Sequence, residues 1–289
     1  MTLSAQNNLP PVIRHEPKVP AIALVCDSPH SGITYPDGFQ CAAPQNLMRM
    51  GEDNHIHTLW KAAPDVGATL IEATFPRVFI DPNRSLKDLD PDMMDGQWPE
   101  PLSPGEKTRL GKGLIWARLT GGVPIYDRKL PVAEVQDRIE TYYKPYHAAL
   151  SDAIDQHYKQ FNALWHLNLH SMPHNAYEGM GIKTDKQIAD FVLGDRDGTT
   201  CSPEFVDVIA TFLRSKGYSV ACNDPYKGVE LIAQIGQPER NRHSLQIEIL
   251  RPLYMNEDTR EPNEGFTELQ NNLTTLLNVI RDYIVDQTK

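Results

Sequence analysis

The 289-residue chain lacks an excess of basic residues, since Lys and Arg together number 28 and Asp and Glu 38, for a formal net charge of -10. A surface that binds nucleic acid or anionic lipid depends on such an excess, because binding is driven by the release of phosphate counterions. We therefore expect neither nucleic acid nor a membrane as a partner. An acidic small-molecule ligand would need a local cluster of basic side chains.

Long apolar runs are also missing. No run approaches the roughly 20 residues of a membrane span, and the first twenty residues contain no apolar core of the kind found in secretory signals. The cysteines are scattered without a CxxC pair, which favours reduced thiols: Cys26, Cys41, Cys201 and Cys222. These absences predict a cytoplasmic protein.

Three common nucleotide-binding and catalytic motifs are absent. The segment 194–198 (GDRDG) has neither P-loop nor GxGxxG spacing and predicts a turn. Segments 28–32 (SPHSG) and 169–171 (LHS) place a serine beside a histidine, but the chain has no GxSxG motif. A catalytic triad is not normally built from a serine and its own sequence neighbour. The sequence therefore argues against a serine hydrolase.

Short apolar runs alternate with helical periodicity, which predicts an α/β sheet covered by helices on both faces. Strands are expected over residues 21–26, 68–75, 77–80, 122–126, 164–169, 191–193, 218–221 and 245–250, and helices over 44–63, 132–161, 203–215 and 264–286. We expect one domain over 1–289, with an irregular extension over 1–20. A long surface excursion is expected over 84–112, and such loops are often lids.

Polar side chains lie at or just beyond the C-terminal ends of predicted strands, namely His30, Asn83, Arg84 and His170. Open α/β sheets bind ligands outside these ends. Each of the two histidines closes an apolar strand, and a neutral imidazole on a rigid strand end suits Zn²⁺. A structural role for either histidine is an equally good interpretation at this point.

Two polar pairs complete this set. The pair Glu52-Asp53, in the helix predicted over 44–63, offers a carboxylate as a third metal ligand, although acidic residues on helices usually face solvent. The pair Asn83-Arg84 offers a guanidinium fork and a neighbouring amide that together could hold a substrate carboxylate. The alternative for Arg84 is an ordinary surface salt bridge.

A glutamate interrupts the last predicted strand, LQIEIL. Alternation places Gln246, Glu248 and Leu250 on one face and the three apolar residues on the other. A glutamate there is costly unless it is paired, binds a metal or faces a cavity. Burial raises the pKa of a glutamate, which suits a base that takes a proton from water and returns it to a leaving amine. The alternative is the exposed face of an edge strand.

Taken together in this order, these segments resemble the N-formylglutamate amidohydrolase family from about residue 22 to about residue 257. The matching segments are 28–32 (SPHSG), 52–53 (ED), 81–84 (DPNR), 124–126 (PIY), 143–147 (YKPYH), 169–173 (LHSMP), 194–196 (GDR), 246–248 (QIE) and 251–255 (RPLYM). The resemblance implies a three-layer α/β/α fold around a mixed, mostly parallel sheet. That fold is phosphorylase/hydrolase-like and distantly similar to zinc carboxypeptidases and aspartoacylases.

The resemblance also implies roles for single residues. His30 and His170 would bind zinc, Asn83 and Arg84 would hold the substrate carboxylate, and Glu248 would be the general base. The zinc carboxypeptidases and aspartoacylases use an HxxE pair, whereas Ile33 stands third after His30 here. We therefore predict a later carboxylate as third ligand, and choose Asp53 over Glu52.

A second departure is Asn168, where relatives tend to have an aspartate before Leu-His-Ser. It either alters the support of the metal site or is neutral.

The resulting prediction is zinc-dependent hydrolysis of an acidic N-acyl amino acid, with N-formyl-L-glutamate as the first choice and histidine degradation as the implied pathway. Arg128 is expected to stabilise the oxyanion, because it follows a predicted strand, and Arg251 to hold a second carboxylate. Iron, cobalt or nickel also suit a histidine–carboxylate site. The alternatives are another N-acyl amino acid, a peptide C-terminus, or a non-catalytic carboxylate-binding protein. No pattern indicates an oligomeric state.

Overall fold

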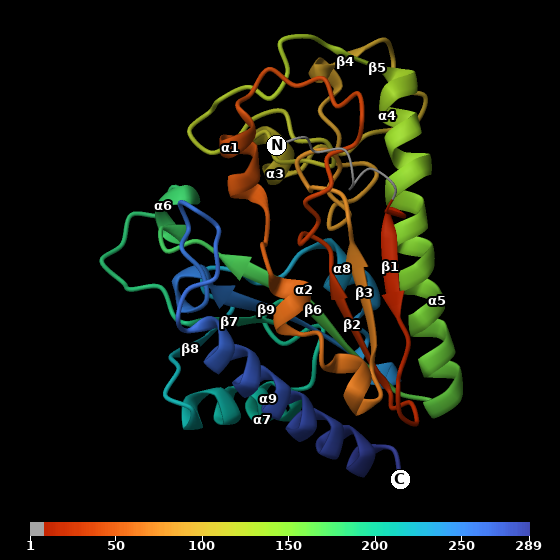
Figure 1. The fold of residues 1–289 in the computed structure, drawn as a ribbon. Helices are drawn as coiled ribbons and strands as arrows, with labels where there is room; N and C mark the ends of the chain where they lie inside the picture. The colour runs from red at the N-terminus through yellow and green to blue at the C-terminus, as the bar shows by residue number, and fades with distance from the viewer. Residues whose placement is uncertain (1–8) are drawn as a thin grey trace. The chain divides into compact units, whose positions relative to one another are not determined.

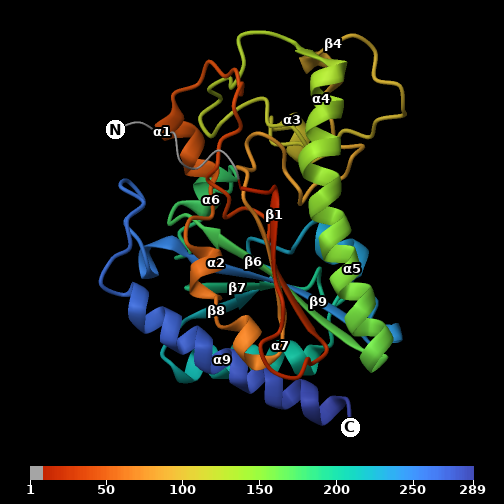
Figure 2. The same cartoon turned by 45° about the vertical axis from the view of Figure 1, so that its right-hand side comes forward.

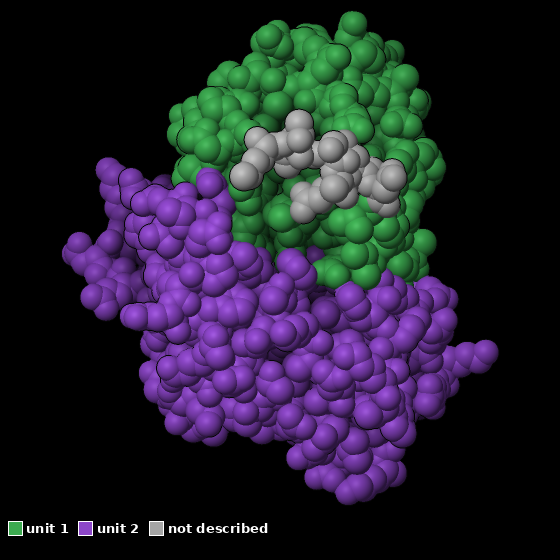
Figure 3. Space-filling model, in the orientation of Figure 1, with its two compact units in different colours: residues 1–13, 29–54, 72–149 green, residues 14–28, 55–71, 150–289 purple. Residues whose placement is uncertain are grey.

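The computed structural model describes residues 9–289, so the first eight residues of the predicted N-terminal extension lie outside the described chain. The chain divides into two compact units, coloured separately in Figure 3. The first contains the described residues up to 13 together with 29–54 and 72–149, and the second contains 14–28, 55–71 and 150–289. The expectation of a single domain stays a prediction.

A seven-stranded sheet forms the centre of the fold, with the strand order β1-β3-β2-β6-β9-β7-β8 (Figure 1). Its strands are β1 Val12–His15, β2 Leu24–Ser28, β3 Thr69–Ala73, β6 Leu164–Met172, β7 Phe191–Gly194, β8 Val220–Cys222 and β9 Arg242–Leu250. Strand β6 pairs in parallel with both β2 and β9, and β7 pairs in parallel with β8 but antiparallel to β9. The sheet is mixed and mostly parallel, as predicted.

The helices are α1 Gln45–Met48, α2 Ile56–Leu59, α3 Glu106–Arg109, α4 Val132–Arg138, α5 Lys144–Phe161, α6 Ala176–Gly179, α7 Pro203–Ser215, α8 Glu230–Ile235 and α9 Phe266–Gln287. A π-helical turn over Ile139–Tyr143 joins α4 to α5, so the helical backbone continues from 132 to 161. Pro145 lies just beyond this turn, and a π-helical turn is one of the ways in which a helix accommodates a missing N–H in its interior. No helix in the described chain is long and apolar enough to cross a membrane.

One face of the sheet in the second unit is apolar. Strands β6 and β9 direct Leu167, Leu169, Leu245 and Ile247 into a core shared with α2, α7 and α9. Helices α7 and α9 lie side by side along this face (Figure 2). Helix α9 contributes apolar residues at helical spacing, which is why the sequence predicts it well: Leu269, Leu273, Leu276, Leu277, Ile280 and Ile284.

The opposite face of the sheet is covered differently. On β3, Leu70 belongs to the apolar core, so the neighbouring Thr69 points to the other side. There the hydroxyl of Thr69 lies 2.9 Å from Nε2 of His157 on α5. Helices therefore cover both faces, as expected for the predicted α/β fold.

Three expectations about local structure are wrong. Residues 12–15 (VIRH), within the predicted irregular extension, form β1, because β-branched residues favour a strand. The helix predicted over 44–63 is broken between α1 and α2, where His55 has a φ of 66° that no α-helix accommodates. No strand forms over 77–80, which is a turn, or over 122–126, where Pro124 makes an isolated β-bridge with Arg118.

The predicted excursion over 84–112 is closed at its base and holds short elements of its own. Arg84 at one end donates through Nε to the carbonyl oxygen of Lys112 at the other end, at 3.0 Å. Within it lie α3 and β4 (Met94–Asp95), which pairs with β5 (Leu130–Pro131). A lid function for the excursion stays a prediction.

Candidate active site

His30 lies two residues beyond the end of β2, as the strand pattern predicts. The loop after it packs closely against the backbone that follows β3, because Thr34 donates to the carbonyl of Thr74 at 2.9 Å. A Cβ atom at Gly32 would lie 2.2 Å from the carbonyl oxygen of Phe75, so only glycine permits this approach. The glycine therefore sets the path of the loop that carries His30.

The imidazole of His30 is buried between two carboxylates. Its Nε2 lies 2.7 Å from Oδ1 of Asp81, and its Nδ1 lies 3.3 Å from Oδ2 of Asp53. The backbone N–H of Asp53 also donates to the His30 carbonyl at 2.9 Å, which fixes the two residues together. An ionised carboxylate only accepts, so Nε2 carries the proton and Nδ1 presents its lone pair on the side of Asp53.

Asp81 is held as a carboxylate by the cations around it. Arg77 donates to its Oδ2 at 2.7 and 3.1 Å, and the indole N–H of Trp116 donates to the same oxygen at 3.2 Å. Burial alone would raise the pKa of Asp81, but Arg77, His30 and Arg84 together hold its pKa well below the ordinary value. The proton on Nε2 of His30 thus has a permanent acceptor.

Of the two acidic residues proposed as third ligand, Asp53 lies beside His30. The carboxylate of Glu52 is engaged elsewhere, since it accepts from Tyr35 and Asn54 at 2.8 Å each and from Arg49 at 3.2 Å. Both residues lie in the non-helical stretch between α1 and α2. The backbone is not helical at Asp53, and its side chain is buried.

His170 lies within β6 rather than after it, because β6 continues to Met172. Its Nε2 is 2.7 Å from Oδ1 of Asn168, two residues earlier on the same face of the strand. In the parallel register of β6 and β9, His170 lies opposite Glu248. Adjacent strands are about 4.8 Å apart, so the imidazole and the carboxylate of these two residues are neighbours on one face.

Glu248 is buried and lies on a polar face, opposite to the apolar face formed by its strand neighbours Ile247 and Ile249. The prediction of alternation in this strand is confirmed. Gln246 on the same face donates to Oε1 of Glu248 at 2.8 Å. Strand β9 pairs on both sides, with β6 and with β7. Glu248 is therefore not on an edge strand.

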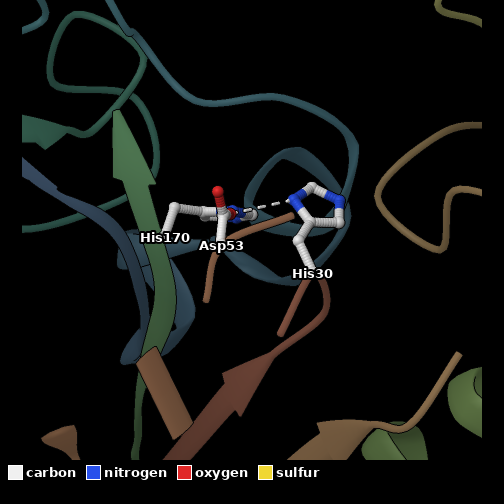
Figure 4. Close-up of side chains that lie close together, drawn as sticks. All are labelled: His30, Asp53 and His170. Atoms are coloured by element: carbon white, nitrogen blue, oxygen red, sulfur yellow. Dashed lines mark ion pairs between the residues drawn. The ribbon is translucent and has the colours of Figure 1, made fainter. Parts of the chain in front are cut away.

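His30, Asp53 and His170 bring possible metal-ligand atoms within 4.8 Å of one another, and all three side chains are buried. Figure 4 shows the three side chains gathered at one place, with the 3.3 Å approach of Nδ1 of His30 to Oδ2 of Asp53 dashed. Two imidazoles and one carboxylate are a ligand set that Zn²⁺ accepts in catalytic sites. Because Nε2 of each histidine faces an acceptor, Nδ1 of each is the atom suited to a metal.

Asn83 and Arg84 follow Asp81 in a turn and are both buried. The backbone N–H of Asn83 donates to Oδ1 of Asp81 at 2.9 Å. Arg84 uses Nε and Nη1 on the carbonyl oxygens of Lys112 and Asn83, at 3.0 and 2.8 Å, and its Nη2 lies 3.8 Å from Asp81. The guanidinium is thereby held in one orientation close to the carboxylate that supports His30.

A cluster of cations surrounds Trp116 in the same unit. The guanidinium of Arg77 lies 5.0 Å and the ammonium of Lys112 5.6 Å from the centre of the indole ring. Burial, together with Arg77, Lys107 and Arg84, lowers the pKa of Lys112 to about 8. Arg77, Arg84 and Lys112 thus form a positive cluster, compensated in part by Asp81.

The remaining arginines predicted for the site have different surroundings. Arg251 follows β9, is buried, and donates through Nε to the hydroxyl of Ser171 at 3.1 Å, next to His170 in the chain. Arg128 forms a two-armed ion pair with Glu134 at 2.8 and 3.1 Å, and the strand predicted before it is absent. The predicted strand that suggested a role for Arg128 does not form, and its role in stabilising the oxyanion stays a prediction.

Comparison with known proteins agrees with this geometry. A model of the N-formylglutamate amidohydrolase family matches residues 22–255. The chain belongs to the N-formylglutamate amidohydrolase family. Two N-formylglutamate deformylases are similar to it: one from Pseudomonas putida is 28% identical over 84% of each chain, and one from Pseudomonas aeruginosa is 26% identical over 82% of this chain and 83% of its own.

Solved structures extend the comparison. The crystal structure of N-formylglutamate amidohydrolase from Ralstonia eutropha is 59% identical, covers 96% of this chain and 100% of its own, and superposes with a TM-score of 0.95. The structure of a gene product from Agrobacterium tumefaciens has a TM-score of 0.68 at 16% identity and 96% coverage of both chains, which shows a shared fold only.

The sequence does not predict several residues that support the site. Asp81 lies in a matched segment, but only its bond to His30 gives it a role. No sequence motif includes Asp27, Arg77 or Lys112. One signal was present for Asp27, which is a charged residue at the end of an otherwise apolar run. Such a residue needs a buried partner.

Proposed function

We propose that this chain is a metal-dependent N-formylglutamate deformylase, which hydrolyses N-formyl-L-glutamate to formate and L-glutamate. The observation that carries the proposal is the buried group His30, Asp53 and His170, in a chain whose relatives bear this activity in their names. Cytoplasmic location and a place in histidine degradation stay predictions from the sequence.

The metal best suited to this group is zinc, held by His30, Asp53 and His170. A zinc ion in such a site acts as a Lewis acid toward a carbonyl oxygen and lowers the pKa of bound water. The chain supports this role by fixing the ring orientation of both histidines through Asp81 and Asn168. Cobalt, nickel and iron suit the same donor set, and the choice among them depends on ligand geometry and metal supply.

Glu248 is proposed as the general base, because it is the carboxylate that strand register places next to His170. It takes a proton from the water whose oxygen attacks the formyl carbon. When the carbon–nitrogen bond breaks, Glu248 returns that proton to the nitrogen, which leaves as the amine of glutamate. The hydrogen bond from Gln246 to Oε1 of Glu248 helps to fix the orientation of the carboxylate.

The substrate carboxylates are assigned to the basic side chains of the site. Asn83 and Arg84 bind one carboxylate and Arg251 contributes to the other, as the family resemblance implies. The positive cluster supports an acidic substrate, since Arg77 and Arg84 share the carboxylate of Asp81 and Lys112 lies close enough to both arginines for them to lower its pKa. An oxyanion role for Arg128 would require its ion pair with Glu134 to open.

Substrate comparison tests the proposal directly. We expect formate release from N-formyl-L-glutamate with a kcat/KM at least about 100-fold above that for N-acetyl- or N-succinyl-L-glutamate and for a formylated neutral amino acid, because pocket size and charge each discriminate by this order. The assay measures formate by a coupled dehydrogenase and free amine by derivatisation. Faster hydrolysis of the acetyl or succinyl compound would favour a different N-acyl amino acid. Binding of N-formylglutamate without hydrolysis, in a metal-replete chain, would favour a carboxylate-binding protein.

Lys112 gives a prediction for pH dependence. Its pKa of about 8 means that the ammonium is charged below pH 8 and loses its proton above it. The charged groups that act on it are the cations Arg77, Lys107 and Arg84. We expect KM for N-formylglutamate to rise as the pH increases through 8, because one positive charge of the cluster disappears.

The Lys112→Met variant removes this charge at every pH. Its KM at pH 7 should be about tenfold higher, because one positive charge that attracts the substrate is lost. Its kcat should stay within about twofold of the wild-type value. The rise in KM near pH 8 should vanish. Lys87→Met, an exposed lysine of the same excursion, is the matched control and should show the wild-type profile. A rise in KM that persists in Lys112→Met would exclude Lys112 as its source.

A further inference from the structure

A chain of buried hydrogen bonds runs along the polar face of the sheet away from His170. Nε2 of His170 lies 2.7 Å from Oδ1 of Asn168, and Nδ2 of Asn168 lies 2.8 Å from Oδ1 of Asp27 on β2. The same oxygen of Asp27 lies 2.9 Å from Nε2 of His166, whose Nδ1 is 2.8 Å from the hydroxyl of Ser244 on β9. Each of these residues is buried.

The direction of the bonds between Asp27 and His170 follows from the amide of Asn168. Its Nδ2 can only donate, and it donates to Oδ1 of Asp27. The amide nitrogen of Asn168 therefore faces Asp27, and its carbonyl oxygen faces His170. His170 must then donate through Nε2–H. At the far end, His166 bridges Oδ1 of Asp27 and the hydroxyl of Ser244 through its two ring nitrogens.

We propose that Asp27 is a positioning residue of the metal site, which acts through Asn168 to hold His170 in the Nε2–H tautomer with the Nδ1 lone pair directed to the metal. Asp27 lies 143 positions earlier in the chain than His170, and it accepts from Nδ2 of Asn168 at 2.8 Å. An asparagine amide on its own has two orientations that differ only in the exchange of oxygen and nitrogen. The hydrogen bond to Asp27 selects the orientation in which the nitrogen of Asn168 faces Asp27 and its oxygen faces His170.

The two metal histidines are thus supported in different ways. His30 donates directly to the carboxylate of Asp81, the common arrangement of a carboxylate behind a histidine ligand. His170 donates to a neutral amide, and the carboxylate stands one residue further back. The asparagine at position 168 is therefore not a simple loss of support, because Asp27 supplies the charge that an aspartate there would have supplied.

The tautomer itself can be observed in the metal-free protein. Chain labelled with ¹⁵N-histidine, stripped of metal, should show His170 with a protonated Nε2 and an unprotonated Nδ1 at neutral pH, with the signal assigned by its absence in His170→Ala. In Asn168→Leu, which has a similar shape but no acceptor, this preference should weaken. A protonated Nδ1 on His170 in the wild-type chain would overturn the proposal.

Metal affinity provides the second readout. Asp27→Asn removes the charge and lets the amide at position 168 adopt either orientation, so we expect the zinc dissociation constant to rise about tenfold or more, the usual effect of losing outer support. Ser244→Ala is the matched control, since it removes a buried hydrogen bond at the other end of the same network and leaves Asn168 anchored. Its dissociation constant should stay within about twofold.

The measurement is competition with a chromogenic chelator, with the melting temperature of each metal-free variant recorded beside it. Equal weakening in Asp27→Asn and Ser244→Ala, or no weakening in Asp27→Asn, would contradict a positioning role for Asp27. The inference rests on the proposed metal site, yet the two can fail separately. A wild-type chain that binds no metal would refute the proposed function, whereas the histidine tautomer reports on Asp27 and Asn168 without any metal.

Discussion

Replacing Glu248 by glutamine is expected to lower kcat for N-formylglutamate on the order of 10²–10⁴-fold while the metal stays bound. The glutamine side chain keeps the shape and the hydrogen-bonding position of the glutamate beside Gln246, but it cannot accept a proton. The variant therefore has no group that takes a proton from the attacking water and returns it to the leaving nitrogen. KM should change little, because Glu248 acts on the reacting atoms rather than on the substrate carboxylates.

The measurement is steady-state formate release together with metal content by elemental analysis. Glu239→Gln is the matched control, because Glu239 is an exposed glutamate close to the start of β9 and its substitution should leave kcat unchanged. A near-normal kcat in Glu248→Gln would exclude Glu248 as the base. Loss of metal in that variant would instead make Glu248 a ligand, which the proposed roles do not allow.

The face of the sheet that carries Glu248 could be predicted because a strand has a period of two. In LQIEIL both polar residues fall on one side with Leu250, and the structure places Leu245, Ile247 and Ile249 in the core on the other side. The same rule applies to His166, Asn168 and His170 on β6, which alternate with Trp165, Leu167 and Leu169. The strand predicted over 164–169 is shorter than β6, which continues to Met172 and carries these three residues on a polar face.

The partners of these residues were not predictable in the same way. His30 and Asp81 are separated by 51 positions, and His166 and Asp27 by 139. Such pairs depend on strand order and register, which the local pattern of one strand does not contain. The break between α1 and α2 shows a related limit. Helical periodicity over 44–63 was real, but the contacts of Glu52 and Asp53 required the backbone to leave the helix there.

Removal of the metal is expected to abolish hydrolysis, with a loss of at least about 10³-fold, because polarisation of the amide and activation of water each account for several kcal/mol of transition-state stabilisation. Dialysis against a chelator should bring the metal content close to zero, and addition of about one equivalent of Zn²⁺ should restore formate release. Repeating the addition with cobalt, nickel and iron(II) ranks the metals by activity per bound ion.

His170→Ala and His174→Ala separate loss of the metal from general damage to the chain. His170 belongs to the buried group with His30 and Asp53, so its loss should lower both metal content and kcat. His174 lies two residues beyond β6, and its exposed side chain pairs with Glu257, so its removal should change neither. Full activity in a chain with almost no metal would refute the proposed metal site. Loss of both metal and activity in His170→Ala alone, with a melting temperature close to that of the wild type, would tie the reaction to the ligand set of His30, Asp53 and His170.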